Sequence, residues 1–185
     1  MAIRMNRFND EVYFAEAPIV KVGREDIELL KQMALDTRRR RVRLCAHQDI
    51  NEPLHEMLIV HTKEAYVRPH KHLNKAESFH LIEGVVDVVF FDESGKIEDV
   101  ARMGQGPAAD SFFYRISGSK YHTLLIRSDF LVFHESTSGP FVRDQTAFAP
   151  WAPAEDDLAG RTMFLRGVED SVKSFLSARD ARGQA

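Results

Sequence analysis

The stretch Tyr66-Val-Arg-Pro-His70-Lys-His72 places two imidazoles two residues apart. In an extended strand, side chains at this spacing project from one face, so both rings can reach one ion. Glu77 follows at an odd offset from His72, which would put its carboxylate on the opposite face of an unbroken strand. The intervening Leu73-Asn-Lys-Ala76 can form a turn, after which Glu77 projects into the same apolar interior as the two rings.

A further histidine, His122, heads a later apolar stretch. Leu124 and Ile126 share its face of a strand, so His122 is one polar group among core residues. Three imidazole nitrogens and one carboxylate oxygen suit a divalent transition metal, with iron, manganese, nickel, cobalt, copper and zinc as candidates. We therefore predict one metal ion held by His70, His72, Glu77 and His122. About two positions of a six-coordinate ion would stay open for substrate or dioxygen.

The sequence around these residues favours strands. Apolar stretches rich in β-branched and aromatic residues follow one another at short intervals, separated by turn residues such as Glu83-Gly84 and Asp92-Glu-Ser-Gly95. The predicted strands are Met57–His61, Ala65–Arg68, Ser78–Ile82, Val85–Phe91, Phe112–Ile116, His122–Ile126 and Phe130–His134. Many short strands joined by tight turns indicate a mainly β sandwich or barrel.

Helical patterns occur only near the two ends. Arg24–Arg38 has apolar residues at helical spacing, acidic residues in its first turn and basic residues in its last. Beyond Phe148 we expect a loop and then one or two helices that include Val168–Arg179. The predicted organisation is one structural domain: an N-terminal strand and helix extension over residues 1–40, a barrel over 41–148, and a C-terminal loop and helix over 149–185.

Composition narrows the class of protein. The 185 residues include 25 basic and 28 acidic groups, a net charge of −3, so no global electrostatic reason exists to bind nucleic acid or an anionic membrane. The single cysteine, Cys45, excludes a thiolate zinc site and an internal disulfide. No long apolar run or signal-peptide pattern is found, and we expect a cytoplasmic protein with a small-molecule ligand.

The metal motif resembles a known family. His70-x-His72, four residues, Glu77, six residues and Gly84 are similar to the first cupin motif, with His122 in the place of the second-motif histidine. Glu64 stands where that motif usually begins with glycine, and Ile126 stands where the second motif usually has asparagine. The resemblance implies a single cupin barrel, a double-stranded β-helix or jelly roll, with the helical segments appended.

A narrower resemblance covers roughly residues 41–156. The segments that carry it are Arg41-x-Arg43-x-x-x-His47, Arg68-Pro-His70-Lys-His72, Lys75-Ala-Glu77, Tyr121-His-Thr123, Glu135, Gly139-Pro140 and Phe148-Ala-Pro-Trp-Ala-Pro-Ala-Glu155. They resemble the WbuC-type cupin-fold metalloproteins, which are associated with lipopolysaccharide O-antigen biosynthesis clusters. Cys45 stands where that pattern suggests asparagine. Proteins of this kind are commonly dimeric, so we expect a homodimer.

Further residues are candidates for chemistry beside the metal. Lys75 could bring its ammonium group to the mouth of the site and act as an acid, and His47 could move a proton or orient a ligand. Arg41 and Arg43 share one face of a strand, and their forked guanidinium groups suit a carboxylate or phosphate. With Arg68 they form the predicted substrate-binding set.

Three hypotheses follow from this sequence. The first is a metalloenzyme, isomerase-like or epimerase-like, that acts on a polar or anionic sugar-related molecule. The second is an iron-dependent oxygenase, which oxygen consumption by the iron-loaded protein would reveal. The third is a non-catalytic module that uses a metal to bind a ligand or to stabilise itself.

Overall fold

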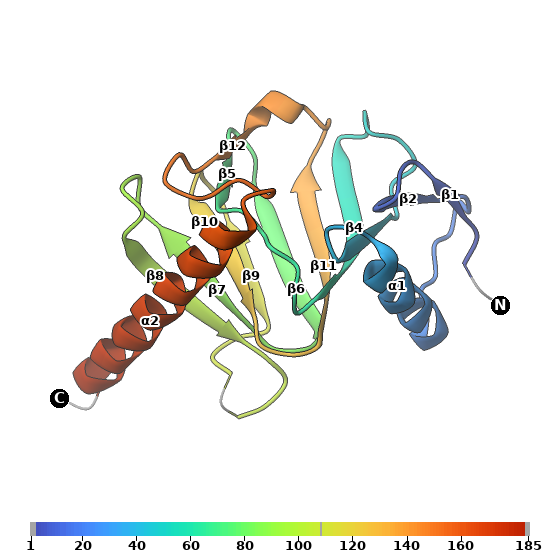
Figure 1. Ribbon diagram of the computed structural model, residues 1–185. Helices are drawn as coiled ribbons and strands as arrows, with labels where there is room; N and C mark the ends of the chain where they lie inside the picture. Colours follow the sequence, from blue (N-terminus) through green and yellow to red (C-terminus); the bar gives the residue numbers. More distant parts are fainter. Residues whose placement is uncertain (1–2, 108, 184–185) are drawn as a thin grey trace.

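The computed structural model describes residues 3–107 and 109–183, and its main feature is a barrel of two facing sheets (Figure 1). The elements in chain order are β1 (Met5–Arg7), β2 (Val12–Ala15), α1 (Arg24–Asp36), β3 (Arg41–Cys45), β4 (Leu54–Thr62), β5 (His70–His72), β6 (Glu77–Glu83), β7 (Val86–Phe91), β8 (Ile97–Met103), β9 (Phe113–Ile116), β10 (Tyr121–Ile126), β11 (Phe130–Ser138), a 3-10 turn (Arg143–Gln145), β12 (Thr146–Phe148) and α2 (Leu158–Gly183).

The strands divide into a seven-stranded sheet, in the order β1-β2-β3-β4-β11-β6-β9, and a five-stranded sheet, in the order β12-β5-β10-β7-β8. Neighbouring strands are antiparallel except β2 and β3, which are parallel. The chain passes repeatedly from one sheet to the other, as it does between β5 and β6. Residues that are close in sequence can therefore face each other across the barrel.

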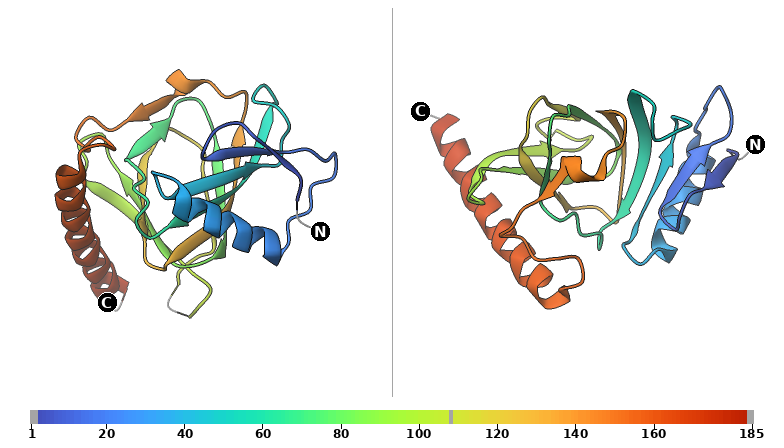
Figure 2. Two further views of the ribbon diagram at one scale, coloured as in Figure 1. Left: turned by 45° about the vertical axis from the view of Figure 1, so that its right-hand side comes forward. Right: turned by 90° about the horizontal axis from the view of Figure 1, so that it is seen from above.

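Each sheet has an inner face toward the barrel core and an outer face that a helix covers. The inner core includes Phe79, Leu81, Val88, Leu124 and Phe133. Figure 2 shows α1 and α2 on opposite flanks of the barrel. The alternation of side chains along each strand thus supplies two apolar surfaces, one for the core and one for a helix.

Helix α1 packs against the outer face of the seven-stranded sheet through Leu30 and Ala34. It begins after Gly23, whose backbone N–H donates to the Asp26 carboxylate at 2.8 Å. It ends at Asp36, because the Thr37 hydroxyl donates to the Ala34 carbonyl and the backbone then turns toward β3. The predicted extension to Arg38 is therefore wrong, and the last turn has no basic residue.

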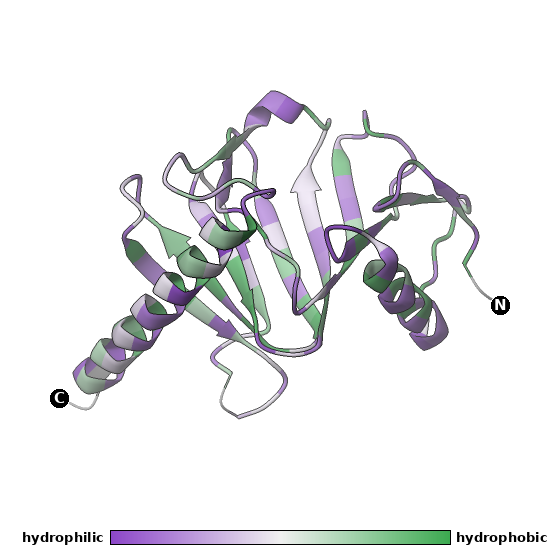
Figure 3. Cartoon of the chain, in the orientation of Figure 1, coloured by the Kyte–Doolittle hydropathy of each residue, from purple (hydrophilic) through white to green (hydrophobic). Residues whose placement is uncertain are grey.

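Helix α2 packs on the outer face of the five-stranded sheet through Val168, Val172 and Leu176. Hydrophilic and hydrophobic residues alternate along it (Figure 3), as expected for a helix with one buried side. Trp151, in the loop before it, packs against Phe91 and Tyr121. The segment after Phe148 thus forms one long helix preceded by a packed loop.

Two predictions about strands are wrong. Residues 65–68 are not a strand, because this segment crosses from β4 in one sheet to β5 in the other. Strand β8, Ile97–Met103, was not predicted, because its charged residues Glu98, Asp99 and Arg102 obscure any apolar run. The helices in the described part of the chain include none that is long and apolar enough to cross a membrane.

Candidate metal centre

The residues of the predicted metal site meet at one end of the barrel interior. His70 and His72 lie on β5, and His122 lies directly opposite His70 on the neighbouring strand β10. One ring nitrogen from each of these three histidines lies within 4.8 Å of the others. Three histidines are therefore positioned to bind one metal ion.

Glu77 approaches this cluster from the other sheet. The break predicted between His72 and Glu77 exists, and Asn74 within it has a positive φ of 58°. The Glu77 Oε2 atom lies 3.2 Å from His72 Nε2, and Oε1 lies 3.6 Å from His122 Nε2. Two ligand atoms that each lie about 2.1 Å from one ion at an angle near 100° are about 3.2 Å apart. These distances place the Glu77 carboxylate beside the three histidines, and its role as a fourth ligand remains a prediction.

The hydrogen bonds of the rings orient their free nitrogens. His70 Nδ1 lies 2.9 Å from the Arg68 carbonyl oxygen, and His122 Nδ1 lies 3.0 Å from that of Lys120. A carbonyl can only accept, so both Nδ1 atoms carry the proton and both Nε2 atoms keep a lone pair for a metal. The third ring, His72, has its Nδ1 atom 3.1 Å from the Thr146 hydroxyl of β12.

The protonation of the site also suits a cation. Burial, with the neighbouring rings of His122 and His72, lowers the pKa of His70 to about 3, so this imidazole is neutral at pH 7. Burial alone would raise the pKa of Glu77, but the nearby His122 and His72 outweigh it and hold this pKa at about 2. At neutral pH the site thus combines a neutral imidazole donor with an ionised carboxylate.

Two residues outside the predicted site, Tyr114 and Glu135, lie beside this cluster. The Tyr114 hydroxyl donates to Glu77 Oε1 at 3.1 Å. Glu135, on β11, pairs across the sheet with Phe79, and its carboxylate interacts with the charges of Glu77, Arg43 and His72. Burial, with repulsion from Glu77, raises the pKa of Glu135 to about 7. Glu135 shares a strand face with the core residue Phe133. This alternation could have indicated an inward-facing Glu135, but the predicted strand ended at His134.

Lys75 and His47 already have partners. Lys75 Nζ donates to the Pro140 carbonyl at 2.8 Å, and burial lowers its pKa. The His47 ring stacks on His55, with centroids 4.1 Å apart and planes 6° from parallel. Its Nδ1 atom lies 3.1 Å from the Glu56 carbonyl oxygen. Their catalytic roles remain predictions.

The three predicted substrate-binding arginines have different surroundings. Arg41 forms ion pairs with Glu11 at 3.2 Å and with Glu155 at 3.5 Å. Arg68 donates to the backbone carbonyls of Ala149 and Ala152. Arg43 points its Nη1 atom at the Met57 sulfur, 3.8 Å away, and forms no ion pair within the described residues. Of the three, Arg43 has the guanidinium group that is most available to a ligand.

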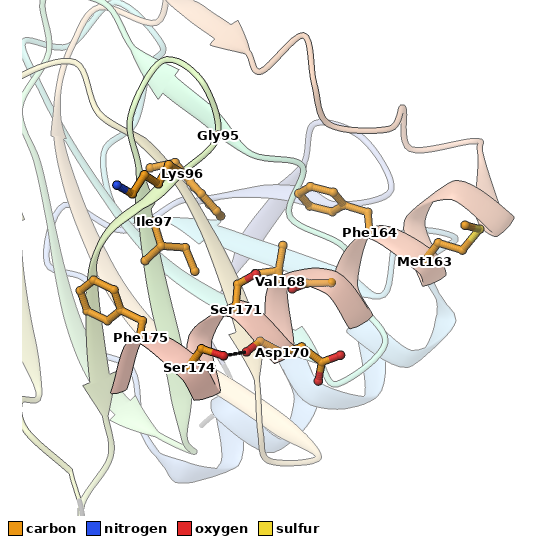
Figure 4. A pocket seen from close by; sticks show the side chains of 12 residues that line it. Gly95, Lys96, Ile97, Met163, Phe164, Val168, Asp170, Ser171, Ser174 and Phe175 are labelled. Carbon is orange, nitrogen blue, oxygen red and sulfur yellow. Dashed lines mark hydrogen bonds between the residues drawn. The ribbon is translucent and has the colours of Figure 1, made fainter. Parts of the chain in front are cut away.

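A surface groove lies elsewhere on the molecule (Figure 4). It has a volume of about 810 Å³ and runs between the β7–β8 hairpin and α2, on the outer side of the five-stranded sheet. Phe164, Val168 and Phe175 line it together with Lys96 and serines of α2. Its described lining includes no histidine or cysteine, so this groove is unrelated to the candidate metal centre.

Comparisons with known proteins support the fold. A domain family of unknown function, DUF6016, matches residues 22–103. No curated protein matches the chain. A structural-genomics protein from Shewanella oneidensis has a similar structure, with 10% sequence identity and a TM-score of 0.50 over 57% of this chain and 72% of that one.

Two structures of named proteins are similar over a smaller part. Oxalate decarboxylase from Bacillus subtilis is 21% identical over 54% of this chain, with a TM-score of 0.43, and the match spans only 24% of the decarboxylase. A putative sugar phosphate isomerase from Acidithiobacillus ferrooxidans is 13% identical over 48% of this chain and 51% of its own length, with a TM-score of 0.38.

The strand topology confirms the predicted fold class. The chain is a mainly β, single cupin-type barrel with an N-terminal helix and a C-terminal helix. The strand topology and the three clustered histidines agree with the fold that the cupin resemblance implies, and membership of that superfamily remains a prediction. The narrower resemblance to the WbuC type remains a prediction.

Proposed function

We propose that this protein is a mononuclear metalloenzyme that acts on a small polar or anionic molecule related to sugars. The observation that carries this proposal is the convergence of His70, His72 and His122, within 4.8 Å of one another, next to the Glu77 carboxylate. A donor set of three imidazoles and one carboxylate suits iron, manganese, nickel or zinc. Isomerisation or epimerisation is the reaction that we favour.

When bound, the ion would supply Lewis acidity at an oxygen of the ligand. The protein's own groups would hold the ligand and exclude water. Phe79 and Phe133 stack at 4.1 Å in the core beside the site, and Tyr114 stacks on Phe79 at 5.1 Å. This apolar wall lowers the local dielectric constant and strengthens each polar contact made inside.

Several parts of the proposal come from the narrower resemblance. We propose a role in lipopolysaccharide O-antigen biosynthesis, a cytoplasmic location and a homodimer. Lys75 and His47 stay as proposed proton carriers, and Arg41 and Arg68 stay as proposed ligand contacts. To reach a ligand, Lys75 would have to leave the Pro140 carbonyl. Light scattering during size-exclusion chromatography tests the dimer, which a mass near 21.1 kDa in solution would contradict.

Elemental analysis of tag-free protein tests the metal site. The protein is incubated in turn with iron, manganese, nickel and zinc, dialysed and analysed beside the variants His70→Ala and Glu77→Ala. We expect about one equivalent of metal in the wild type and a large loss in both variants. A wild type without stoichiometric metal after all four incubations would refute the proposed function.

A further inference from the structure

Two charged side chains inside the barrel form no ion pair within the described residues. Arg43 lies on the inner face of β3, because Cys45, two residues later, belongs to the inner core. Glu135 lies on the inner face of β11, since it pairs with Met57 and Phe79 of that core. An inward-facing position is unusual for either residue type.

Met57 connects the two groups. It lies directly across from Glu135 on one side and from Cys45 on the other. Its sulfur contacts Arg43 Nη1 at 3.8 Å, so the arginine side chain extends along the sheet toward the row that contains Glu135. The guanidinium and the carboxylate therefore flank the same part of the barrel interior.

The two groups nevertheless form no direct ion pair. Among the described residues, the charges that act on the Glu135 carboxylate are those of Glu77, Arg43 and His72, and this carboxylate accepts no hydrogen bond. Opposite charges in a low-dielectric interior attract strongly, and buried polar groups normally find partners. A guanidinium and a carboxylate that flank one space without touching can both be satisfied by a molecule between them.

The positions of the two groups relative to the metal cluster set the chemistry of that molecule. Glu77 pairs with Thr137 of β11, and Glu135 lies two residues before Thr137 on the same inner face of the seven-stranded sheet. Arg43 supplies a fork of donors for a carboxylate or a phosphate. Glu135 is able to accept a hydrogen bond from a hydroxyl group.

We propose that Arg43 and Glu135 are the ligand-recognition pair of this site and that the ligand is a small hydroxylated anion. Arg43 binds its carboxylate or phosphate group, and Glu135 accepts a hydrogen bond from one of its hydroxyl groups. This inference rests on the proposed function, because it names the substrate class of the same site. It adds Glu135 to the predicted site and separates Arg43 from Arg41 and Arg68, whose guanidinium groups are already engaged.

Isothermal titration calorimetry on the zinc-loaded protein tests the proposal with four probes of similar size. D-glycerate and glycerol 3-phosphate carry both an anion and a hydroxyl group, propionate carries only the anion, and glycerol carries only hydroxyl groups. We expect both hydroxylated anions to bind at least about 10-fold more tightly than propionate or glycerol, since each charged hydrogen bond contributes at about that level. The stronger of the two identifies a carboxylate or a phosphate as the preferred group.

Variants assign the two roles. Arg43→Gln should weaken glycerate and propionate together by about 10-fold, with partial recovery in Arg43→Lys. Glu135→Leu, which removes the acceptor, should abolish the preference for glycerate over propionate. Arg115→Gln and Glu56→Gln, which alter polar residues on outward-facing positions, are matched controls and should bind every probe as the wild type does.

Metal content, measured on the same samples, separates this proposal from the proposed function. A metal-loaded wild type that binds all four probes alike overturns the recognition pair and leaves the metal site intact. A wild type that lacks metal but prefers the hydroxylated anions, with Arg43→Gln weakening both anions and Glu135→Leu abolishing the preference, supports the pair and refutes the metalloenzyme. The comparison of probes on the wild type alone decides the ligand class if a variant fails to fold.

Discussion

Two groups of histidines in this barrel differ in the angle between their rings. In the candidate metal centre, the planes of His70 and His72 are 79° apart, and those of His70 and His122 are 49° apart. In the second group, His47 and His55 lie nearly parallel at 6°, with their centroids 4.1 Å apart. Crossed rings can direct their nitrogens at one point, whereas stacked rings direct them along parallel lines.

Each group includes a histidine that is almost completely buried. His55 and His122 are each 4% exposed. The stacked pair lies on the same inner row as the metal site, because Glu77 pairs with Thr137, which pairs with His55. Proximity and burial of imidazoles are thus insufficient for a metal site. His47 Nδ1 also lies near a backbone carbonyl, so the crossed ring planes of His70, His72 and His122 are the feature that lets their nitrogens converge.

The largest expected effect contrasts the two groups directly. His122→Asn should reduce metal affinity by at least about 100-fold, because it removes one of the converging donors. His55→Asn, at an equally buried position, should retain one equivalent of metal. Competition with a chelator followed by elemental analysis measures both. Equal loss of metal in the two variants would mean that the stacked pair also takes part in the site.

Metal binding should also stabilise the folded chain. Metal at 100 times its dissociation constant adds about 2.7 kcal/mol to the free energy of unfolding if the unfolded chain does not bind it. Thermal unfolding with and without zinc should show this gain in the wild type and in His55→Asn. The gain should be absent in His122→Asn, and a gain of equal size there would place the zinc elsewhere.

A third kind of buried histidine, His61, predicts a pH effect. Burial, with the charges of Arg43 and Arg39, lowers the pKa of His61 to about 3. The unfolded chain takes up a proton near the ordinary value of 6.5, while the folded chain stays neutral, so stability falls as pH decreases below 6.5. Between pH 7 and pH 5 this residue should cost about 2 kcal/mol of stability.

Urea unfolding of the metal-free wild type and of His61→Leu at both pH values measures this effect. The other histidines contribute to both proteins alike, so the difference between the two pH dependences isolates His61. The variant should lose about 2 kcal/mol less than the wild type on acidification. Parallel pH dependences would show that His61 takes up a proton in the folded state.

The smallest effect concerns the group that orients Glu77. Tyr114→Phe removes the hydroxyl that donates to Glu77 Oε1 while the ring can keep its stacking on Phe79. Metal affinity should fall by about 10-fold, the usual cost of losing a group that holds a ligand in place. Tyr66→Phe is the control, since that hydroxyl donates to the Pro153 carbonyl. An unchanged affinity in Tyr114→Phe would exclude an orienting role.

Local spacing was sufficient to predict that three histidines cluster near Glu77. The i, i+2 histidines, the turn before Glu77 and the isolated polar residue at the head of a strand each depend on the alternation of side chains, which is a property of sequence. The residues on the sheet opposite the histidines were harder to predict from sequence. Glu135 was named only in the family resemblance and not among the site residues, because the predicted strand ended one residue too early, and element boundaries depend on tertiary pairing.

Contacts between distant segments were beyond the reach of the sequence pattern. Arg41 and Arg43 have the same residue type and the same inner face, yet Arg41 is bound by Glu11 and Glu155, from opposite ends of the chain, and Arg43 is free of such partners among the described residues. Spacing predicts which face a side chain occupies. It does not predict which charged residue, distant in sequence, forms an ion pair with that side chain.

The pairing of β12 with β5 has a consequence for the order of events during synthesis. Thr146, whose hydroxyl lies 3.1 Å from His72 Nδ1, is 74 residues downstream of that histidine. Phe148 lies directly across from His70, and Ala149 and Ala152 hold Arg68 next to it. A nascent chain that already contains all four candidate ligands still lacks β12, so the contacts that this strand makes with His70 and His72 form only after residues 146–148 have been synthesised.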